Sequence, residues 1–332
     1  MEEHRTLMRR AMHMAGTARM HARPNPWVGA VLRCADGSVF EGATQPPGGP
    51  HAEIVALDAA RTAGADTAGA LLVTTLEPCS HTGRTGPCTD AIIAAGISTV
   101  VSAVADPDTK VAGTGFTQLR AAGIEVLEGV CADEVTEQLR PYLHHRRTNR
   151  PFVLLKMATT LDARTAVPGG PRWITGDAAR VRVHELRAES DAIVTGAGTV
   201  RDDDPALTVR DADGPSPRRI VLSHGAVPAG AKVNPCTVWS GDIEPLLDEL
   251  GADGVVQLMV EAGPTVADTF RSRGLVDRYV FHVAPVLSGS VDAPGVFADR
   301  TPHPLSLGRL VSTDRLGDDI ELIIDPIKET AA

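Results

Sequence analysis

The sequence predicts an α/β protein of two domains, and three observations lead to this class. The chain has 332 residues, about twice the length of a common domain. Hydrophobic residues make up 43% of the chain but aromatic residues only 3%, so Ala, Val, Leu and Ile must form the core. The 32 Gly and 24 Pro favour many short strands and helices joined by tight turns over a coiled coil or a helical bundle.

The first half alternates helix-like and strand-like segments. Two of its apolar runs, Leu71–Val73 and Val100–Val104, barely alternate with polar residues, as in strands that are covered on both faces. This pattern predicts a three-layer α/β/α domain. The expected helices are residues 1–16, 51–64, 88–96 and 117–123, and the expected strands are 27–34, 38–42, 70–76, 98–106 and 124–129.

A basic helix over residues 132–150 leads to Pro151, where the alternation begins again. We therefore place the domains at 1–148 and 149–332, and no internal repeat relates them. The expected strands of the second domain are 151–158, 191–198, 218–223, 255–263, 276–285 and 320–325, with helices at 181–189 and 265–274.

Charge and cysteine content limit the kinds of partner and the compartment. A net charge of −10 disfavours a long nucleic-acid ligand, because such ligands require a basic face. No run approaches the roughly 18 apolar residues of a membrane span, and the N-terminus lacks the apolar core of a secretory signal. The odd, scattered set of five cysteines favours metal or thiolate use over disulfides. We expect a cytoplasmic protein that binds neither nucleic acid nor membrane.

One set of residues in the first half predicts a catalytic zinc site. His51 is followed by Glu53, and two cysteines, Cys79 and Cys88, each come directly after a proline. One His and two Cys leave a fourth zinc position open, as catalysis requires. Cys79 and Cys88 both lie near expected helix starts, where the helix dipole favours the thiolate. The alternative is a helix-start histidine and two core thiols. Cys34, Cys131 and Cys236 lack such partners, and we interpret them as structural.

The same residues predict the chemistry. Zinc lowers the pKa of a bound water toward about 7, and a nearby carboxylate can carry the proton to a departing amine. His-x-Glu followed by Pro-Cys is the signature of zinc deaminases, in which the Glu is not a ligand. We expect His51, Cys79 and Cys88 to bind zinc and Glu53 to be catalytic. The usual spacing between the cysteines is about two residues, but here eight residues intervene.

Two Gly-containing turns in the second half are candidate phosphate-binding turns. Gly196–Thr199 and Glu261–Thr265 each follow an expected strand. Backbone amides at such turns can approach phosphates. Neither turn has the Rossmann or the P-loop spacing, and each, taken alone, is more often a simple tight turn.

Several motifs resemble one family, the bifunctional deaminase–reductases of riboflavin biosynthesis. The segment Pro78–Cys88 reads PCSHTGRTGPC, Asn25–Val31 reads NPWVGAV, and Ala105–Pro107 reads ADP. The resemblance runs through the whole chain. It implies a cytidine-deaminase-like first domain acting on a diaminopyrimidinone that carries a ribosylamino 5′-phosphate. The residues that it implies as substrate contacts in this domain are Asn25, His81, Arg84 and Asp106.

For the second domain the resemblance implies a dihydrofolate-reductase-like fold, with NADPH reducing the ribosyl group to ribityl. It rests on Phe152–Lys156, Thr160–Asp162, Trp173–Thr175, His184–Ala188 and Asp203–Thr208. The implied substrate contacts are Arg187, Leu207, Arg210 and Glu261. The implied NADPH contacts are Ala158, Trp173, Thr199, Asp203, Gly263, Pro264 and Thr265. Lys156 and Asp162 are candidate catalytic residues that polarise or protonate the substrate, or else a structural ion pair.

The chain departs from the family's pattern at four positions. Ala163 and Ala262 stand where the family has Gly, Pro171 stands at a substrate-binding Ser, and Asp108 stands at an Asn. The departures leave open a deaminase whose second half is only a nucleotide-binding or assembly module. A further alternative is a nucleoside or tRNA deaminase with an accessory domain. The family's assemblies imply a homodimer or homotetramer.

Overall fold

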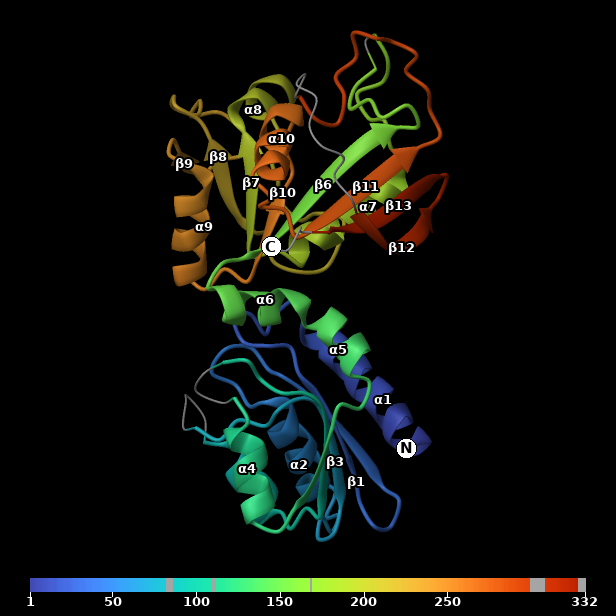
Figure 1. Ribbon diagram of the computed structural model, residues 1–332, viewed down its shortest axis with the longest axis vertical. Helices are drawn as coiled ribbons and strands as arrows, with labels where there is room; N and C mark the ends of the chain where they lie inside the picture. The colour runs from blue at the N-terminus through green and yellow to red at the C-terminus, as the bar shows by residue number, and fades with distance from the viewer. Residues whose placement is uncertain (82–85, 109–111, 168, 299–307, 328–332) are drawn as a thin grey trace. The chain divides into compact units, whose positions relative to one another are not determined.

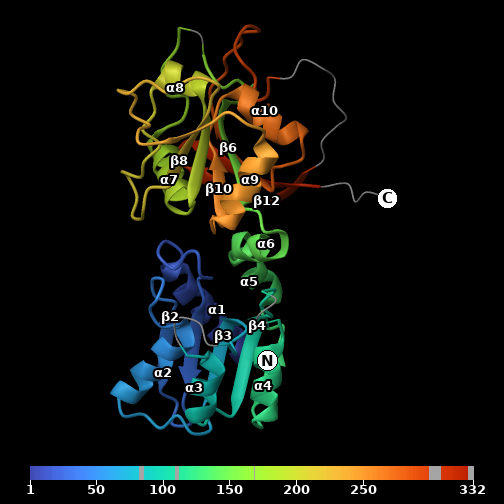
Figure 2. The ribbon, with the colours of Figure 1, turned by 90° about the vertical axis from the view of Figure 1, so that its left-hand side faces the viewer.

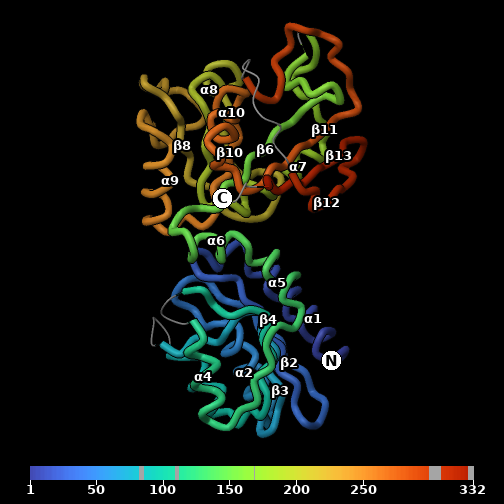
Figure 3. The backbone as a smooth tube through the Cα atoms, viewed as in Figure 1, coloured from blue at the N-terminus to red at the C-terminus, as the bar shows by residue number. Residues whose placement is uncertain are grey.

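The computed structural model describes residues 1–81, 86–108, 112–167, 169–298 and 308–327. The chain forms two compact units, Met1–Asn149 and Arg150–Ala332 (Figure 1). The sequence places the boundary after residue 148, and in the structure the boundary along the chain falls one residue later, after Asn149. Figure 3 traces the backbone through both units, and each unit has its own sheet.

The first unit contains a five-stranded sheet in the order β2-β1-β3-β4-β5. Strand β1 is antiparallel to both of its neighbours, whereas β3, β4 and β5 run parallel. Every residue of β3 is buried, as its unbroken apolar run predicts for a strand covered on both faces. The strands are β1 (Gly29–Arg33), β2 (Val39–Ala43), β3 (Leu71–Leu76), β4 (Thr99–Val104) and β5 (Glu125–Glu128).

Helices cover both faces of this sheet and make the three layers that the sequence predicts. In Figure 1, α2 and α4 lie on one side of the strands and α1 and α5 on the other, and Figure 2 shows α3 beside α2. The helices are α1 (Glu2–Ala18), α2 (Ala52–Thr62), α3 (Cys88–Ala94), α4 (Thr114–Ala121), α5 (Ala132–Gln138) and α6 (Arg140–Thr148).

One glycine lets α2 lie directly on the sheet. A Cβ atom at Gly42 on β2 would meet the carbonyl oxygen of Ala52 at 2.1 Å, a distance that no side chain permits. The close approach places the first turn of α2, with Glu53 in it, against the sheet.

The expected basic helix over 132–150 is wrong in one respect, because the structure has two helices there. The chain breaks at Leu139, between α5 and α6. Pro141 lies in the first turn of α6, where its missing N–H does not matter, whereas inside a continuous helix it would break a hydrogen bond.

The second unit contains an eight-stranded sheet in the order β12-β13-β11-β6-β10-β7-β8-β9. Strands β11, β6, β10, β7, β8 and β9 run parallel, and the pair β13 and β12 adds an antiparallel edge. The strands are β6 (Phe152–Thr160), β7 (Ala192–Gly196), β8 (Arg218–Leu222), β9 (Thr237–Trp239), β10 (Gln257–Val260), β11 (Arg278–Ala284), β12 (Gly308–Leu316) and β13 (Asp319–Pro326).

Two apolar cores lie on the two faces of this sheet. Side chains of α9 and α10 pack with Val153, Leu155 and Met157 of β6 on one face. Side chains of α7 pack with Leu154 and its neighbours on the other. The helices are α7 (Asp177–Ala188), α8 (Ala197–Asp203), α9 (Ile243–Ala252) and α10 (Pro264–Ser272). The predicted α/β class, deaminase-like in the first half and reductase-like in the second, is confirmed.

Four elements of the second unit are absent from the sequence prediction. These are β9, β12, α8 and α9. The turn expected at 196–199 is the start of α8, and the expected strands otherwise appear near their predicted positions. Within the described part of the chain, no helix has the length and apolar character needed to cross a bilayer.

Candidate functional site

Three side chains from three elements meet at one point of the first unit. His51 is the N-cap of α2, Cys79 follows β3, and Cys88 is the first residue of α3. The Nδ1 atom of His51 lies 3.5 Å from the sulfur of Cys79 and 3.3 Å from that of Cys88. Tetrahedral zinc with ordinary bond lengths separates a nitrogen and a sulfur ligand by about 3.6 Å. All three donor atoms lie within 4.8 Å of one another, so this cluster fits zinc.

Of the two thiols, Cys79 is the one that its surroundings deprotonate, whereas the hydrogen bond to Cys79 and burial raise the pKa of Cys88. Cys88 donates to Cys79 through its side chain and through its backbone N–H, which lies 3.4 Å from the Cys79 sulfur. These contacts lower the pKa of the Cys79 thiol to about 4, so a thiolate is present at neutral pH.

Glu53 lies in the first turn of α2, and its side chain reaches this cluster. It is only 3% exposed. Burial, and then the negative charge of Cys79, raises the pKa of Glu53 to about 7. A carboxyl group with a pKa near neutrality can both take and give a proton, as a proton shuttle must.

Glu77, just before Cys79, is a buried acceptor for backbone amides. One carboxylate oxygen accepts from the N–H groups of Asp106 and Gly113 at 3.2 and 3.0 Å. The other accepts from those of Gly115 and Phe116 at 3.0 and 3.4 Å. Glu77 therefore ties the Cys79 segment to the end of β4 and to the start of α4. In the sequence, only its position beside Pro78 and Cys79 indicates a role for Glu77.

Asp106 is buried after β4, and Tyr142 of α6 donates a hydrogen bond to its carboxylate. Asn25 lies partly exposed in the turn between α1 and β1, and His81 is exposed after Cys79. Arg84 lies outside the described residues. The structure thus brings together the four predicted zinc and proton-transfer residues, and it places Asp106, Asn25 and His81 on loops of the same unit.

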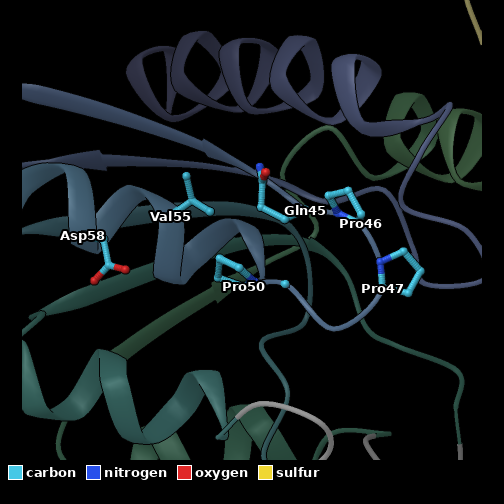
Figure 4. Close-up of a pocket in the computed structure, with 7 residues that line it drawn as sticks. Gln45, Pro46, Pro47, Pro50, Val55 and Asp58 are labelled. Carbon is cyan, nitrogen blue, oxygen red and sulfur yellow. The ribbon is translucent and has the colours of Figure 1, made fainter.

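A shallow groove of about 620 Å³ lies beside the start of α2 (Figure 4). Its walls are Gln45, Pro46, Pro47, Gly49, Pro50, Val55 and Asp58. Pro50 precedes the ligand His51, but the groove does not include the zinc residues themselves.

In the second unit, the predicted cofactor turns lie at the carboxyl ends of adjacent parallel strands β7 and β10. Thr199 accepts a hydrogen bond from the backbone N–H of Gly263 at 3.1 Å, which joins the two turns. Gly263 is the N-cap of α10, with Pro264 and Thr265 in its first turn. Open α/β sheets bind nucleotides at this edge, so the arrangement fits NADPH.

Arg187 of α7 and Glu261 after β10 form a two-bond ion pair. The Nε and Nη2 atoms of Arg187 donate to the two carboxylate oxygens of Glu261 at 2.8 and 2.7 Å. Burial alone would raise the pKa of Glu261, but Arg187 keeps it below its ordinary value. Lys156 on β6 is 8% exposed, and burial lowers the pKa of its ammonium group, against the effect of Glu261.

Asp162 holds together two loops. Its carboxylate accepts from the hydroxyl of Thr160 at 2.5 Å and from the backbone N–H groups of Ser288 and Gly289 at 3.0 and 2.9 Å. These bonds lower the pKa of Asp162 to about 2. It is ionised at neutral pH, so these contacts favour a structural role over proton donation.

The remaining predicted residues occupy the strands and loops around this edge. Trp173 is 59% exposed, with the guanidinium of Arg172 stacked 5.1 Å from its ring centre. Arg172 also donates to the backbone oxygen of Asp203, which brings two predicted NADPH contacts together. Ala158 lies on β6. Leu207 is buried, and Arg210 donates to Thr208 and to His184.

These features define a class of protein: a zinc-dependent deaminase and an NADPH-dependent reductase in one chain. Residues 1–104 match the cytidine and deoxycytidylate deaminase zinc-binding region. Residues 151–322 match the RibD C-terminal domain. The chain belongs to the RibD family of bifunctional deaminase–reductases of riboflavin biosynthesis. Both activities and both cofactors that the sequence predicts are thereby confirmed.

The similarity covers both units. The riboflavin biosynthesis protein RibD of Mycobacterium tuberculosis strain H37Rv is 43% identical over 287 residues, 82% of this chain and 84% of that protein. RibD of Escherichia coli K12 is 39% identical over 332 residues, 87% of this chain and 89% of its own. A RibD structure from Acinetobacter baumannii superposes with a TM-score of 0.91 at 33% identity and covers 98% of this chain and 99% of that chain.

A Thermotoga maritima structure is described as a diaminohydroxyphosphoribosylaminopyrimidine deaminase/5-amino-6-(5-phosphoribosylamino)uracil reductase. It superposes with a TM-score of 0.87 at 33% identity and covers 98% of this chain and 99% of that chain.

Proposed function

We propose that residues 1–148 deaminate 2,5-diamino-6-ribosylamino-4(3H)-pyrimidinone 5′-phosphate and that residues 149–332 then reduce its ribosyl group to ribityl. The description of the Thermotoga maritima relative supports these substrates. The observation that carries the first step is the cluster of His51, Cys79 and Cys88, with the side chain of Glu53 beside it.

The three ligands and Glu53 have separate tasks. His51, Cys79 and Cys88 would hold the zinc ion, which would supply a Lewis acid that activates water near neutral pH. Glu53 takes a proton from the attacking water and gives it to the leaving amine, so that the C–N bond breaks and ammonia departs. A pKa near 7 suits Glu53 for both transfers.

For the substrate of this step, we assign contacts to Asn25, His81, Arg84 and Asp106. A guanidinium group matches phosphate oxygens in shape and charge, so Arg84 is the assigned phosphate partner. We assign the buried carboxylate of Asp106 as the acceptor for the pyrimidine ring.

For the reduction, bound NADPH would supply a hydride to the ribose C1′ carbon. We assign NADPH binding to Ala158, Trp173, Thr199, Asp203 and the turn Gly263–Thr265, and substrate binding to Arg187, Leu207, Arg210 and Glu261. Lys156, buried near Glu261, gives a proton to the ring oxygen as the sugar opens. Asp162 fixes the adjoining loops.

Metal analysis with two cysteine variants tests the first step. We expect about one zinc per chain, lost in Cys79→Ser and kept in Cys34→Ser, which changes a buried thiol outside the cluster. Glu53→Ala should keep zinc and release no ammonia. A fully active protein without zinc contradicts the mechanism.

NADPH oxidation tests the second step. With the deaminated substrate, the protein should oxidise NADPH, and the absorbance of the reduced nicotinamide at about 340 nm should fall. Absence of consumption, with deamination intact, would favour the deaminase-only alternative.

We further propose a cytoplasmic homodimer or homotetramer that binds neither nucleic acid nor membrane. The five cysteines, all free, suit a reducing compartment, and the net charge of −10 opposes nucleic-acid binding. Light scattering of the purified chain measures the oligomeric state.

A further inference from the structure

Helix α6 presents two side chains to the segment that follows β4. Tyr142 is 3% exposed, and its hydroxyl lies 3.2 and 3.1 Å from the two carboxylate oxygens of Asp106. Burial and the charge of Asp106 raise the pKa of Tyr142, so its hydroxyl stays protonated and donates. A hydrogen bond to a charged acceptor is among the stronger ones in proteins.

Asp106 is held by two further residues. The backbone N–H of Asp108 donates to one of its carboxylate oxygens at 2.9 Å, and Glu77 accepts from its backbone N–H at 3.2 Å. Glu77 acts on the backbone of this segment, whereas Tyr142 and the backbone N–H of Asp108 both donate to the carboxylate itself. The direction of that carboxylate therefore depends in part on α6.

Arg146, one turn further along α6, lies beside the same group. Its guanidinium carbon is 5.0 Å from the ring centre of Tyr142, and its Nε atom is 3.7 Å from a carboxylate oxygen of Asp108. Asp108 brings a negative charge to a position where the family has a neutral Asn. An anionic substrate would be repelled by this charge, and the charge of Arg146 offsets it.

We propose that Tyr142 and Arg146 are positioning residues of the deaminase site: Tyr142 orients the carboxylate of Asp106, and Arg146 balances the charge of Asp108. This inference rests on the proposed function, in which Asp106 contacts the pyrimidine substrate. Neither residue touches the zinc cluster, so both act on substrate binding and not on the proton transfer by Glu53.

The variant Tyr142→Phe keeps the ring and removes the hydroxyl. Loss of one hydrogen bond to a charged group predicts a rise in the KM of the pyrimidine substrate of about 10-fold, with kcat changed by no more than about twofold. Zinc content and NADPH oxidation on the deaminated substrate should stay at wild-type values. Tyr279→Phe, which changes a tyrosine of the second unit, is the matched control and should leave the KM for deamination unchanged.

A double-mutant cycle with Asp106→Asn separates positioning from general stability. If Tyr142 acts through Asp106, Tyr142→Phe should have little further effect on KM in the Asp106→Asn chain. An equal effect in both backgrounds, or a wild-type KM for Tyr142→Phe, overturns the inference. A wild-type KM for Asp106→Asn instead refutes the substrate role of Asp106 in the proposed function, and the inference falls with it.

A second cycle tests Arg146. Arg146→Met should raise the KM for deamination by about fivefold when residue 108 is Asp, because an unbalanced negative charge then lies next to the assigned substrate contact Asp106 and repels the anionic substrate. In the Asp108→Asn chain the same change should have almost no effect. An increase of equal size in both chains would show that Arg146 supports the fold and does not balance Asp108.

Discussion

Ala163 has a left-handed backbone, with a φ of 58°, directly after Asp162. This conformation suits glycine, which the family has at this position, and it strains a residue with a Cβ atom. Ala in place of Gly at position 163 therefore strains the backbone but leaves the hydrogen bonds of Asp162 in place.

Ala163→Gly should stabilise the second unit by about 0.5–1 kcal/mol, because relief of the strain outweighs the added freedom of the unfolded chain. The measurement is the urea midpoint reported by Trp173 and Trp239 in a Trp27→Phe chain. Ala166, also exposed and three residues away, does not have a positive φ. Ala166→Gly should be neutral or destabilising, and a matching stabilisation there would contradict the argument.

At the residue scale, the sequence predicted the zinc cluster because proline and histidine spacings mark it locally. His51 with Glu53, and a Pro before each cysteine, are short-range signals. The partners of Asp106 have no such signal. Tyr142 lies 36 positions away on another helix, and only the fold brings the two together. Asp162, a predicted catalytic candidate, accepts backbone hydrogen bonds from a loop 126 residues later, which no local pattern in the sequence indicates.

Between elements, the contact of α2 with β2 sets the position of Glu53 and His51. Gly42→Ala should destabilise the first unit by about 2 kcal/mol or more, because its methyl group would overlap the backbone of Ala52. Zinc content should fall as well. Gly16→Ala is the control, since Gly16 is an exposed helical glycine whose Cβ would meet nothing closer than 3.9 Å. That change should be neutral or stabilising, and an equal loss in both variants would contradict the packing argument.

A buried hydrogen-bonded set of three side chains joins β11, β13 and α7. His282 is fully buried, and its Nε2 atom lies 2.9 Å from Glu321, which also accepts from Arg182 at 3.4 Å. Burial lowers the pKa of His282 below its ordinary 6.5, against the attraction of Glu321, and the charges of Lys156 and Arg182 lower it further. The folded unit therefore resists protonation of His282.

The stability of the second unit should depend on pH through His282. The unfolded chain binds a proton on this histidine as the pH falls below 6.5, before the folded chain does. The second unit should therefore lose stability between about pH 7 and pH 5.5, and His282→Gln should flatten that loss. The urea midpoints of the two chains at several pH values measure it. A steeper or unchanged slope in His282→Gln would be inconsistent with a neutral buried imidazole.

The elements missed from the sequence have identifiable reasons. Strand β12 is mostly exposed, so it lacks the apolar pattern by which strands are recognised. Strand β9 has only three residues. Helix α9 does carry apolar residues at helical spacing, Ile243, Leu246, Leu247 and Leu250, and this signal was available. Helix α8 is short and has Gly196 as its N-cap and Gly198 in its first turn, so its sequence favours a turn over a helix.

At the scale of the whole molecule, the two chemistries use separate residues. All four zinc and proton-transfer residues belong to the first unit, and the assigned NADPH and hydride-transfer residues belong to the second. Removal of zinc by a chelator should abolish ammonia release and leave NADPH oxidation on the deaminated substrate within about twofold of the untreated rate. Added zinc should restore ammonia release. Parallel loss of both activities would contradict this division of labour.

The net charge of −10 also bears on the whole molecule. An anionic phosphate substrate approaches against the overall field, so it needs placed cations, and we propose Arg187 as one of them. In the structure Arg187 is already paired with Glu261, which neutralises much of its charge before any substrate binds.

Glu77 has a consequence for how this sequence can change over time. Among the described residues, it accepts hydrogen bonds from four backbone amides, so the side chain of residue 116 can vary without loss of that bond. Gly113 and Gly115 are different: Gly113 has a φ of 80°, and a Cβ atom at Gly115 would meet the carbonyl oxygen of Pro78 at 2.1 Å. Among related sequences, Glu77 and these two glycines should therefore be inherited together, while residue 116 drifts.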